Sequence, residues 1–350
     1  MAKGSITMRS KSLVVVAVPL VALMCVACGG ASDAAVGQGS ADAAEGDETL
    51  SLVAYSTPEV VYNEIIPDFQ QTPEGEGIGF KTSFGASGEQ SRAVESGQPA
   101  DVVTFSLEPD ITRLVDADIV SADWSETPHD GLAHTSVVSF IVREGNPEGI
   151  ESWDDLLEPG VEVITPNPFT SGAAKWNLLA AYAVAGDGGR DEQAGLAYVR
   201  ELISEHIPVQ PKSGREALQT FLAGQGDVLL SYEYEATTAR KKGERLDYVV
   251  PDETISIENP IAVTADAPEA AQAFVDYVLS KPAQERFAEW GYRPVDEEVL
   301  AANAERFPEP SGLFTIRDLG GWEEVDAKLF DPEGGAIARL EEEAGVSTAK

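Results

Sequence analysis

From about residue 50 onward, short runs rich in β-branched residues alternate with longer stretches of helical periodicity. This alternation is typical of an α/β fold, in which helices flank a sheet. The expected strands cover residues 50–55, 78–83, 101–105, 137–142, 161–165, 207–211, 228–232 and 248–250. The expected helices cover residues 60–71, 89–96, 111–117, 173–184, 190–206, 217–223 and 268–280. Strand 207–211 has the weakest support, since Pro208 and Pro211 restrict it to a sheet edge.

The amino-terminal segment has the pattern of an export signal. Lys3, Arg9 and Lys11 precede an apolar run over residues 13–27 that ends in small residues. At about 15 residues this run is shorter than the ~20 that a membrane-spanning helix needs. We therefore expect residues 1–27 to be a signal peptide that is removed on export.

The end of that signal resembles a bacterial lipoprotein cleavage site, Val26-Ala27-Cys28-Gly29. We expect Cys28 to be acylated and residues 28–48 to form a disordered tether that holds the protein on the outer face of the cytoplasmic membrane. The alternative is ordinary cleavage after an alanine, with Cys25 and Cys28 incidental.

Charge excludes one class of partner. The chain has 24 basic and 60 acidic residues, a formal net charge of −36, and the three basic residues of the signal would be lost with it. Nucleic acid binding requires a basic surface, so nucleic acid is not an expected partner. An anionic ligand would be repelled at long range. Any anion site must therefore work through local dipoles.

Four expected strand-to-helix junctions carry a serine where it can cap the next helix, at Ser56, Ser87, Ser171 and Ser213. A helix start leaves backbone N–H groups unpaired at the positive end of the helix dipole, where they can bind an anion. Ligands of open α/β sheets bind at the edge where such junctions lie. Each cap taken alone is also explained by helix stability, at ~1 kcal/mol.

An ordered set of motifs runs through these junctions, from about residue 50 to residue 328. It comprises residues 87–88, 90, 92–94, 100–104, 145–147, 153–156, 163–168, 170–172, 176–177, 220–221, 226–229, 233, 292–294, 313–316 and 320–322. The most specific stretch is Val-Ile-Thr-Pro-Asn-Pro at 163–168, which is followed by Thr170, Ser171 and Gly172. This set resembles the periplasmic sulfate-binding proteins of ABC importers.

This resemblance implies a type II periplasmic-binding-protein fold with two lobes, each a mixed sheet flanked by helices, and a ligand cleft between them. We place residues 49–136 and 252–350 in one lobe and residues 137–251 in the other. It also implies sulfate or thiosulfate as ligand, ABC transporter permease subunits as partners, a monomer, no cofactor and no enzymatic activity.

The family binds a dehydrated sulfate through backbone N–H groups, one serine hydroxyl and one tryptophan N–H. Carried over by position, the ligand-binding residues are Ser56, Ser171, Gly172 and Ala173 through their backbone, Ser87 through its hydroxyl, Tyr232 in the place of the tryptophan, and Gly214 or Arg215. A family lysine is replaced by Glu89.

Sulfate only accepts hydrogen bonds at neutral pH, whereas phosphate keeps a proton and needs an acceptor. The expected ligand shell contains no carboxylate side chain, which favours sulfate over phosphate because a carboxylate facing sulfate would bury like charges in contact. This preference for sulfate requires that the side chains of Glu89 and Glu233 point away from the ligand.

Other functions are possible for an α/β chain of this composition. Molybdate and tungstate present the same acceptor-only face, and the motifs favour sulfate over them. Tyr232, Glu233 and Tyr234 could form part of a ferric-ion site, but an ordinary strand end also explains them, and no metal site is expected. A hydrolase is disfavoured, since no G-x-S-x-G motif occurs and the three histidines have no nucleophile or metal spacing. A purely structural surface lipoprotein is a further alternative.

Overall fold

The computed structural model describes Met1 and residues 48–348. Every helix and strand of the described residues belongs to one compact unit, Gly39–Lys350. The expected signal peptide, the acylation site Cys28 and the tether up to residue 47 lie outside the described residues.

The strands of residues 48–348 form one mixed sheet in the order β2-β1-β3-β8-β4-β6-β5, with β7 paired to β4 and β9 paired to β8. Their bounds are β1 Glu48–Tyr55, β2 Ile78–Gly85, β3 Val102–Thr104, β4 Leu132–Arg143, β5 Val163–Ile164, β6 Val228–Tyr232, β7 Leu246–Val249, β8 Glu253–Val263 and β9 Gly312–Phe314. Strand β1 is parallel to β2 and β3, and β5 is parallel to β6. The long strands β4 and β8 run antiparallel in the middle of the sheet.

Strand β8 joins the two parts of the sheet. Its residues 256–260 pair with β4 and its residues 261–263 pair with β3. The transfer occurs at Pro260, whose missing N–H removes a ladder bond at this point. The Pro260 carbonyl is still used, because it accepts hydrogen bonds from the Phe105 N–H and the Thr104 hydroxyl.

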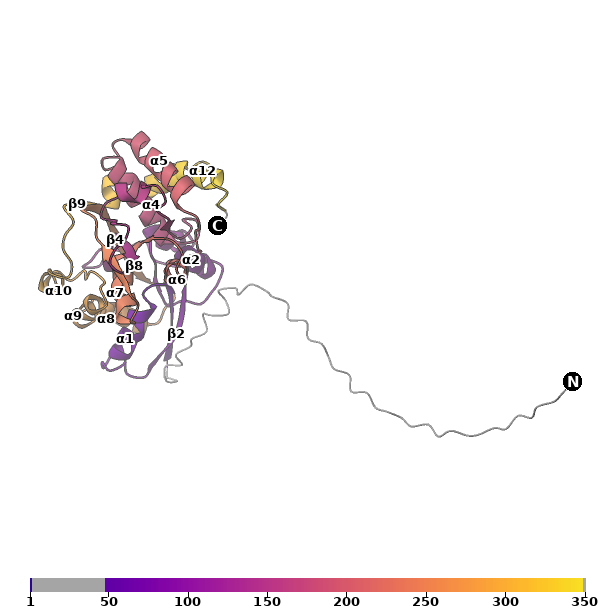
Figure 1. Cartoon of the computed structure of the whole chain (residues 1–350). Coiled ribbons are helices and arrows are strands. Elements are labelled where there is room, and N and C mark those ends of the chain that lie inside the picture. Colours follow the sequence, from indigo (N-terminus) through magenta and orange to yellow (C-terminus); the bar gives the residue numbers. More distant parts are fainter. Residues whose placement is uncertain (2–47, 349–350) are drawn as a thin grey trace. The chain divides into compact units, whose positions relative to one another are not determined.

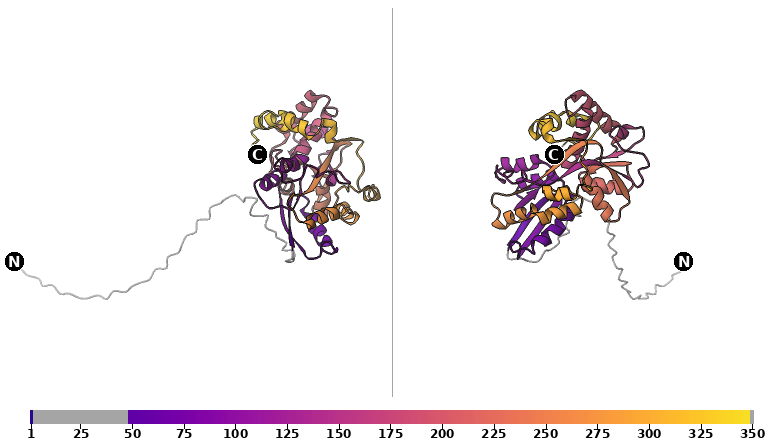
Figure 2. Two further views of the ribbon diagram at one scale, coloured as in Figure 1. Left: turned by 180° about the vertical axis from the view of Figure 1, so that it is seen from behind. Right: turned by 90° about the vertical axis from the view of Figure 1, so that its left-hand side faces the viewer.

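The helices flank this sheet, as Figures 1 and 2 show. Their bounds are α1 Glu59–Phe69, α2 Ser87–Glu95, α3 Glu108–Asp116, α4 Gly172–Ala185, α5 Glu192–Glu201, α6 Gly214–Leu222, α7 Glu233–Lys241, α8 Glu269–Val278, α9 Lys281–Glu289, α10 Glu297–Ala302, α11 Trp322–Val325 and α12 Ala336–Glu343. Shorter turns are η2 Asp154–Leu157, η3 Leu202–His206, η4 Ile316–Leu319 and η5 Asp326–Phe330. Helices α1, α8 and α9 pack together, and the carboxyl-terminal α12 packs against α5 (Figure 1).

Helix α4 is the central helix of the fold. Residues 172–183 are all buried, and the helix packs against β6, β8 and α5. Among them, Trp176 is fully buried and contacts the Trp322 ring edge-on at 4.7 Å between centroids. The first turn of α4 is thereby held at a fixed position inside the molecule.

The predicted α/β organisation is confirmed, with one strand wrong. All seven predicted helices are present, and the one over 190–206 continues from α5 into a π-helical turn, η3. The predicted strand at 207–211 is absent; this segment is an extended loop, and the Pro211 carbonyl accepts a hydrogen bond from the Asn167 N–H instead of joining a ladder. Strands β8 and β9 and helices α7 and α9 to α12 were not predicted.

Among residues 48–348, none of the helices combines the length and the apolar character required to traverse a lipid bilayer.

Candidate anion-binding site

The predicted ligand residues lie at the ends of strands or at the starts of helices. Ser56 follows β1, Ser87 opens α2, Ser171 precedes α4, Gly214 opens α6 and Tyr232 ends β6. All five are buried. Their contacts divide into two groups, one around Ser87 and Tyr232 and the other around Ser56 and Gly214.

The first group is held together by Ser106, which sequence reasoning missed. The Ser106 N–H donates to Ser87 Oγ at 3.0 Å, and the Ser106 hydroxyl lies 2.5 Å from the Tyr232 hydroxyl. The Ser106 carbonyl accepts from Trp176 Nε1 at 2.8 Å. Ser106 is fully buried and follows β3. It therefore occupies a strand-to-helix junction like those of the predicted serines, and this placement was the signal available in the sequence.

Gly172 brings the first turn of α4 against Ser106. A Cβ built on Gly172 would lie 2.4 Å from Ser106 Oγ and 2.7 Å from the Leu107 side chain. No side chain fits in that space. The predicted donors Gly172 and Ala173 thus lie beside the hydroxyl pair, and their N–H groups have no partner within the helix because they belong to its first turn.

The second group connects Ser56 with the start of α6. The Arg215 guanidinium donates to the Ser56 carbonyl and also pairs with Glu59. A Cβ built on Gly214 would lie 3.2 Å from the Thr57 side chain and 3.8 Å from the Ala173 Cβ. The start of α6 therefore packs against both the loop after β1 and the first turn of α4.

The serines differ from the expected capping pattern. Four serines were expected to cap helices: Ser56, Ser87, Ser171 and Ser213. Of these, only Ser213 accepts a hydrogen bond from a backbone N–H of its helix, that of Glu216 at 3.2 Å. Helix α1 starts after Pro58 and α2 starts after Ala86, so Ser56 and Ser87 are not their N-caps. Ser171 does precede α4, but its side chain forms no capping bond and its N–H donates to the Asn167 carbonyl at 2.9 Å.

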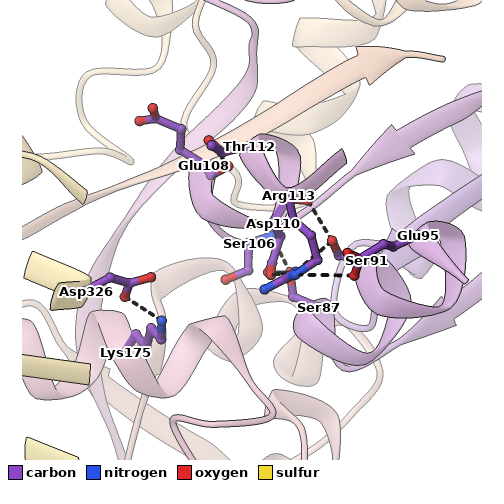
Figure 3. Close-up of polar contacts among 10 residues, drawn as sticks. All are labelled: Ser87, Ser91, Glu95, Ser106, Glu108, Asp110, Thr112, Arg113, Lys175 and Asp326. Atoms are coloured by element: carbon purple, nitrogen blue, oxygen red, sulfur yellow. Dashed lines mark hydrogen bonds and ion pairs between the residues drawn. The ribbon is translucent and has the colours of Figure 1, made fainter. Parts of the chain in front are cut away.

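The Ser87 hydroxyl is bound to a carboxylate. It donates to Asp110 Oδ2 at 2.7 Å, and Asp110 Oδ1 accepts from Arg113 Nη1 at 2.9 Å (Figure 3). Arg113 Nη1 also donates to the Ser91 hydroxyl at 2.8 Å. These hydrogen bonds, through Ser87, Asp110 and Arg113, connect α2 to α3 next to Ser106.

Glu89 and Glu233 each lie near a cation. Glu89 Oε1 lies 3.8 Å from Lys212 Nζ, and Glu233 Oε2 lies 2.7 Å from Arg293 Nε. Burial raises the pKa of Glu233, and the adjacent Arg293 partly offsets this rise. The carboxylates that sequence analysis required to point away therefore have cationic neighbours.

Basic side chains lie near the first turn of α4. Arg92, Arg113 and Lys175 line a cavity of about 30 Å³ together with Ser171 and Gly172. Lys175 pairs with Asp326 at 2.5 Å, so its charge is compensated (Figure 3). Burial lowers the pKa of Arg92. Burial also raises the pKa of Tyr232, which keeps its hydroxyl protonated and able to donate at neutral pH.

The side chains considered for a ferric-ion site contact different partners. The Tyr232 hydroxyl contacts Ser106, the Tyr234 hydroxyl contacts Thr57 at 2.6 Å, and Glu233 pairs with Arg293. Tyr232 and Tyr234 stack on each other with their centroids 4.9 Å apart. Strand β6 ends at Tyr232, and Glu233 and Tyr234 lie in the first turn of helix α7, so the interpretation of all three residues as a strand end is wrong.

Known proteins share this fold. The family model for bacterial extracellular solute-binding proteins matches residues 50–293. The chain belongs to that family.

Relatives of this chain within the family include sulfate- and thiosulfate-binding proteins. The sulfate-binding protein of Synechococcus elongatus is 39% identical over 324 residues, which cover 88% of this chain and 89% of that protein. The thiosulfate-binding protein of Pseudomonas aeruginosa is 34% identical, with 89% of this chain and 97% of that protein covered. The structure of the sulfate-binding protein SubI from Mycobacterium tuberculosis is 50% identical, covers 81% of this chain and all of SubI, and superimposes with a TM-score of 0.80. The predicted resemblance and fold class are confirmed.

Proposed function

We propose that this chain captures sulfate outside the cytoplasm and delivers it to the permease subunits of an ABC transporter, with thiosulfate as the second candidate ligand. The observation that carries the proposal is the meeting of two hydroxyls and the first turn of α4 at Ser106, Tyr232 and Gly172. These groups offer hydrogen-bond donors to an anion that only accepts. The names of the relatives point to the same ligands.

Most of the ligand-binding residues in this proposal are those predicted from sequence. Backbone groups of Ser56, Ser171, Gly172 and Ala173, with Gly214 or Arg215, would surround the anion. If the Ser171 N–H binds the anion, its hydrogen bond to the Asn167 carbonyl must break. In this proposal residues 49–136 and 252–350 form one lobe, residues 137–251 form the other, and their closure removes water from the anion.

The test is calorimetric titration of the full chain with sulfate, thiosulfate, molybdate and phosphate at neutral pH. We expect sulfate or thiosulfate to bind and phosphate to bind at least tenfold more weakly. Because Trp176 contacts Ser106 through its indole N–H, tryptophan fluorescence should change on binding. Tighter binding of phosphate than of sulfate, or no binding of any of the four anions, would contradict the proposal.

We also propose that the protein is a monomeric lipoprotein, anchored through Cys28 to the outer face of the cytoplasmic membrane, and that it is not an enzyme. Replacement of Cys28 by Ser should move the protein from the membrane fraction to the soluble exported fraction. Cys25→Ser is the matched control, since its thiol lies three residues earlier in the signal and would be removed with it. Unchanged membrane association of the Cys28→Ser variant would refute the anchor.

A further inference from the structure

We propose that Ser106 and Tyr232 act as one hydroxyl pair that donates a single hydrogen bond to the bound anion, while Ser87 holds Ser106 in position. The inference rests on the proposed function, because it assigns residues to the same site. It adds Ser106 to the ligand-binding residues and gives Ser87 a supporting role.

The first step concerns the single hydroxyl proton of Ser87. This proton is donated to Asp110 Oδ2 at 2.7 Å, and a carboxylate can only accept. The oxygen of Ser87 in turn accepts the Ser106 N–H at 3.0 Å. Both Ser87 and Asp110 are 3% exposed. Turning the Ser87 hydroxyl toward an anion would leave a buried carboxylate oxygen without its donor, which is costly.

The second step concerns the two hydroxyl protons of Ser106 and Tyr232. Their oxygens lie 2.5 Å apart, and one proton occupies the bond between them. Whichever residue donates that bond, the other proton of the pair is left for a third group. The pair therefore offers one donor, and the position of the proton can adapt to the ligand.

The third step concerns the orientation of Ser106. The Ser106 N–H donates to Ser87 Oγ, and the Ser106 carbonyl accepts from Trp176 Nε1. The same carbonyl also accepts from Asn259 Nδ2 at 3.4 Å. With both backbone groups occupied, the side chain is the part of Ser106 that can bind a ligand. Its oxygen lies against Gly172, where the first turn of α4 presents its unpaired N–H groups.

One other group could accept the remaining proton. The amide oxygen of Asn259 is buried and has no hydrogen-bond partner within residues 48–348. If the pair donated to Asn259 in the loaded protein, removing either hydroxyl would leave anion affinity nearly unchanged. The experiment separates these two acceptors.

The experiment measures sulfate affinity by calorimetry for the full chain and for Ser106→Ala, Tyr232→Phe and the double variant. A lost hydrogen bond to a charged group corresponds to a weakening of about 10- to 100-fold, which we expect for the double variant because no hydroxyl of the pair remains. Each single variant should be weakened no more than the double variant, because the hydroxyl that remains keeps a proton it can donate to the anion. Ser139→Ala removes another buried serine hydroxyl, on β4, and should leave the affinity unchanged.

The outcomes are distinguishable. No sulfate binding by the unaltered chain defeats the proposed function itself. Sulfate binding by the unaltered chain and by the double variant with affinities within twofold of each other overturns this inference alone. Should Ser106→Ala fail to fold, Ser106→Cys combined with Tyr232→Phe replaces the double variant, because a thiol is only a weak donor and the phenyl ring still stacks on Tyr234.

Discussion

Lys175 Nζ lies 2.5 Å from Asp326 Oδ1, which ties the first turn of α4 to η5 near the carboxyl terminus (Figure 3). The Lys175 side chain is 10% exposed and that of Asp326 is 32% exposed. The ammonium group also lies 5.2 Å from the centroid of the Phe330 ring, on the same carboxyl-terminal turn. The position of the proposed anion-binding turn therefore depends on a segment about 150 residues away along the chain.

Asp326→Asn should destabilise the protein by about 1–3 kcal/mol, because it leaves the mostly buried Lys175 ammonium without its counter-charge. This loss of stability is smaller than that expected for a fully buried ion pair, because solvent reaches Asp326. Urea denaturation measures the change. The exposed pair of Lys328 with Glu192, at 2.9 Å, is the control, and Lys328→Met should cost less than about 1 kcal/mol. Equal losses in the two variants would contradict the burial argument.

Gly172→Ala should disrupt both folding and anion binding. The added methyl would lie 2.4 Å from Ser106 Oγ and 2.7 Å from Leu107, so either α4 or the loop after β3 must move. We expect a loss of about 1–3 kcal/mol in the free energy of unfolding, despite the gain in helix propensity.

Gly88→Ala is the matched control, because Gly88 also lies in a first helix turn, that of α2. There the nearest atom to an added methyl is Arg92 Nη1 at 3.1 Å, the far end of a long side chain. Its stability should change by less than about 1 kcal/mol. Thermal unfolding of both variants gives the comparison, and a Gly172→Ala variant as stable as Gly88→Ala would show that the contact with Ser106 is loose.

Strand β8 shows why part of the fold was missed. Its sequence contains acidic residues and, at Asn259-Pro260, a proline that is normally excluded from a central strand. The strand forms because Pro260 lies where pairing passes from β4 to β3, so its missing N–H is tolerated. The predicted strand at 207–211 also contains prolines and has no such position available. The local sequence pattern cannot tell β8 from the segment 207–211, because the difference depends on which strands lie beside each of them.

The site was predictable in its positions but not in its hydrogen bonds. Junction patterns and family motifs located Ser87, Gly172 and Tyr232, and the structure brings them around Ser106. That Ser87 gives its proton to Asp110, 23 residues later, and that Tyr232 meets Ser106, 126 residues earlier, depends on tertiary packing. The assignment of a donor to the anion therefore changes once the other acceptors are known.

The ion pair of Glu233 and Arg293 should be a strong determinant of stability. The two side chains are 2% and 9% exposed, and their nearest atoms lie 2.7 Å apart. Arg293→Met should cost about 3–5 kcal/mol, because it leaves a carboxylate buried without a partner. The double variant Glu233→Leu with Arg293→Met should recover most of that loss. A double-mutant cycle in urea checks this, with the exposed pair Asp187 and Arg190 as control. Additive losses would mean that the two residues act independently.

Two buried glutamates should make stability depend on pH between about 4.5 and 7. Burial raises the pKa of Glu235 from 4.5 to about 7, although the Ser231 hydroxyl donates to it and Arg215 and Lys242 act in the opposite direction. Burial likewise raises the pKa of Glu341 to about 7, against the effect of two hydrogen bonds from Gln210.

Because each folded-state pKa exceeds its unfolded value, the native state binds more protons in this range. The free energy of unfolding should therefore be highest below about pH 4.5 with respect to these groups, fall as the pH rises to about 7, and level off above it. Glutamine imitates the neutral acid, so Glu235→Gln and Glu341→Gln should each be more stable than the unaltered protein at pH 8, by about 1–3 kcal/mol. Urea denaturation at pH 5, 6, 7 and 8 measures the slope, with the exposed Glu158→Gln as control. A slope that persists when both buried glutamates are replaced would assign the pH dependence to other groups.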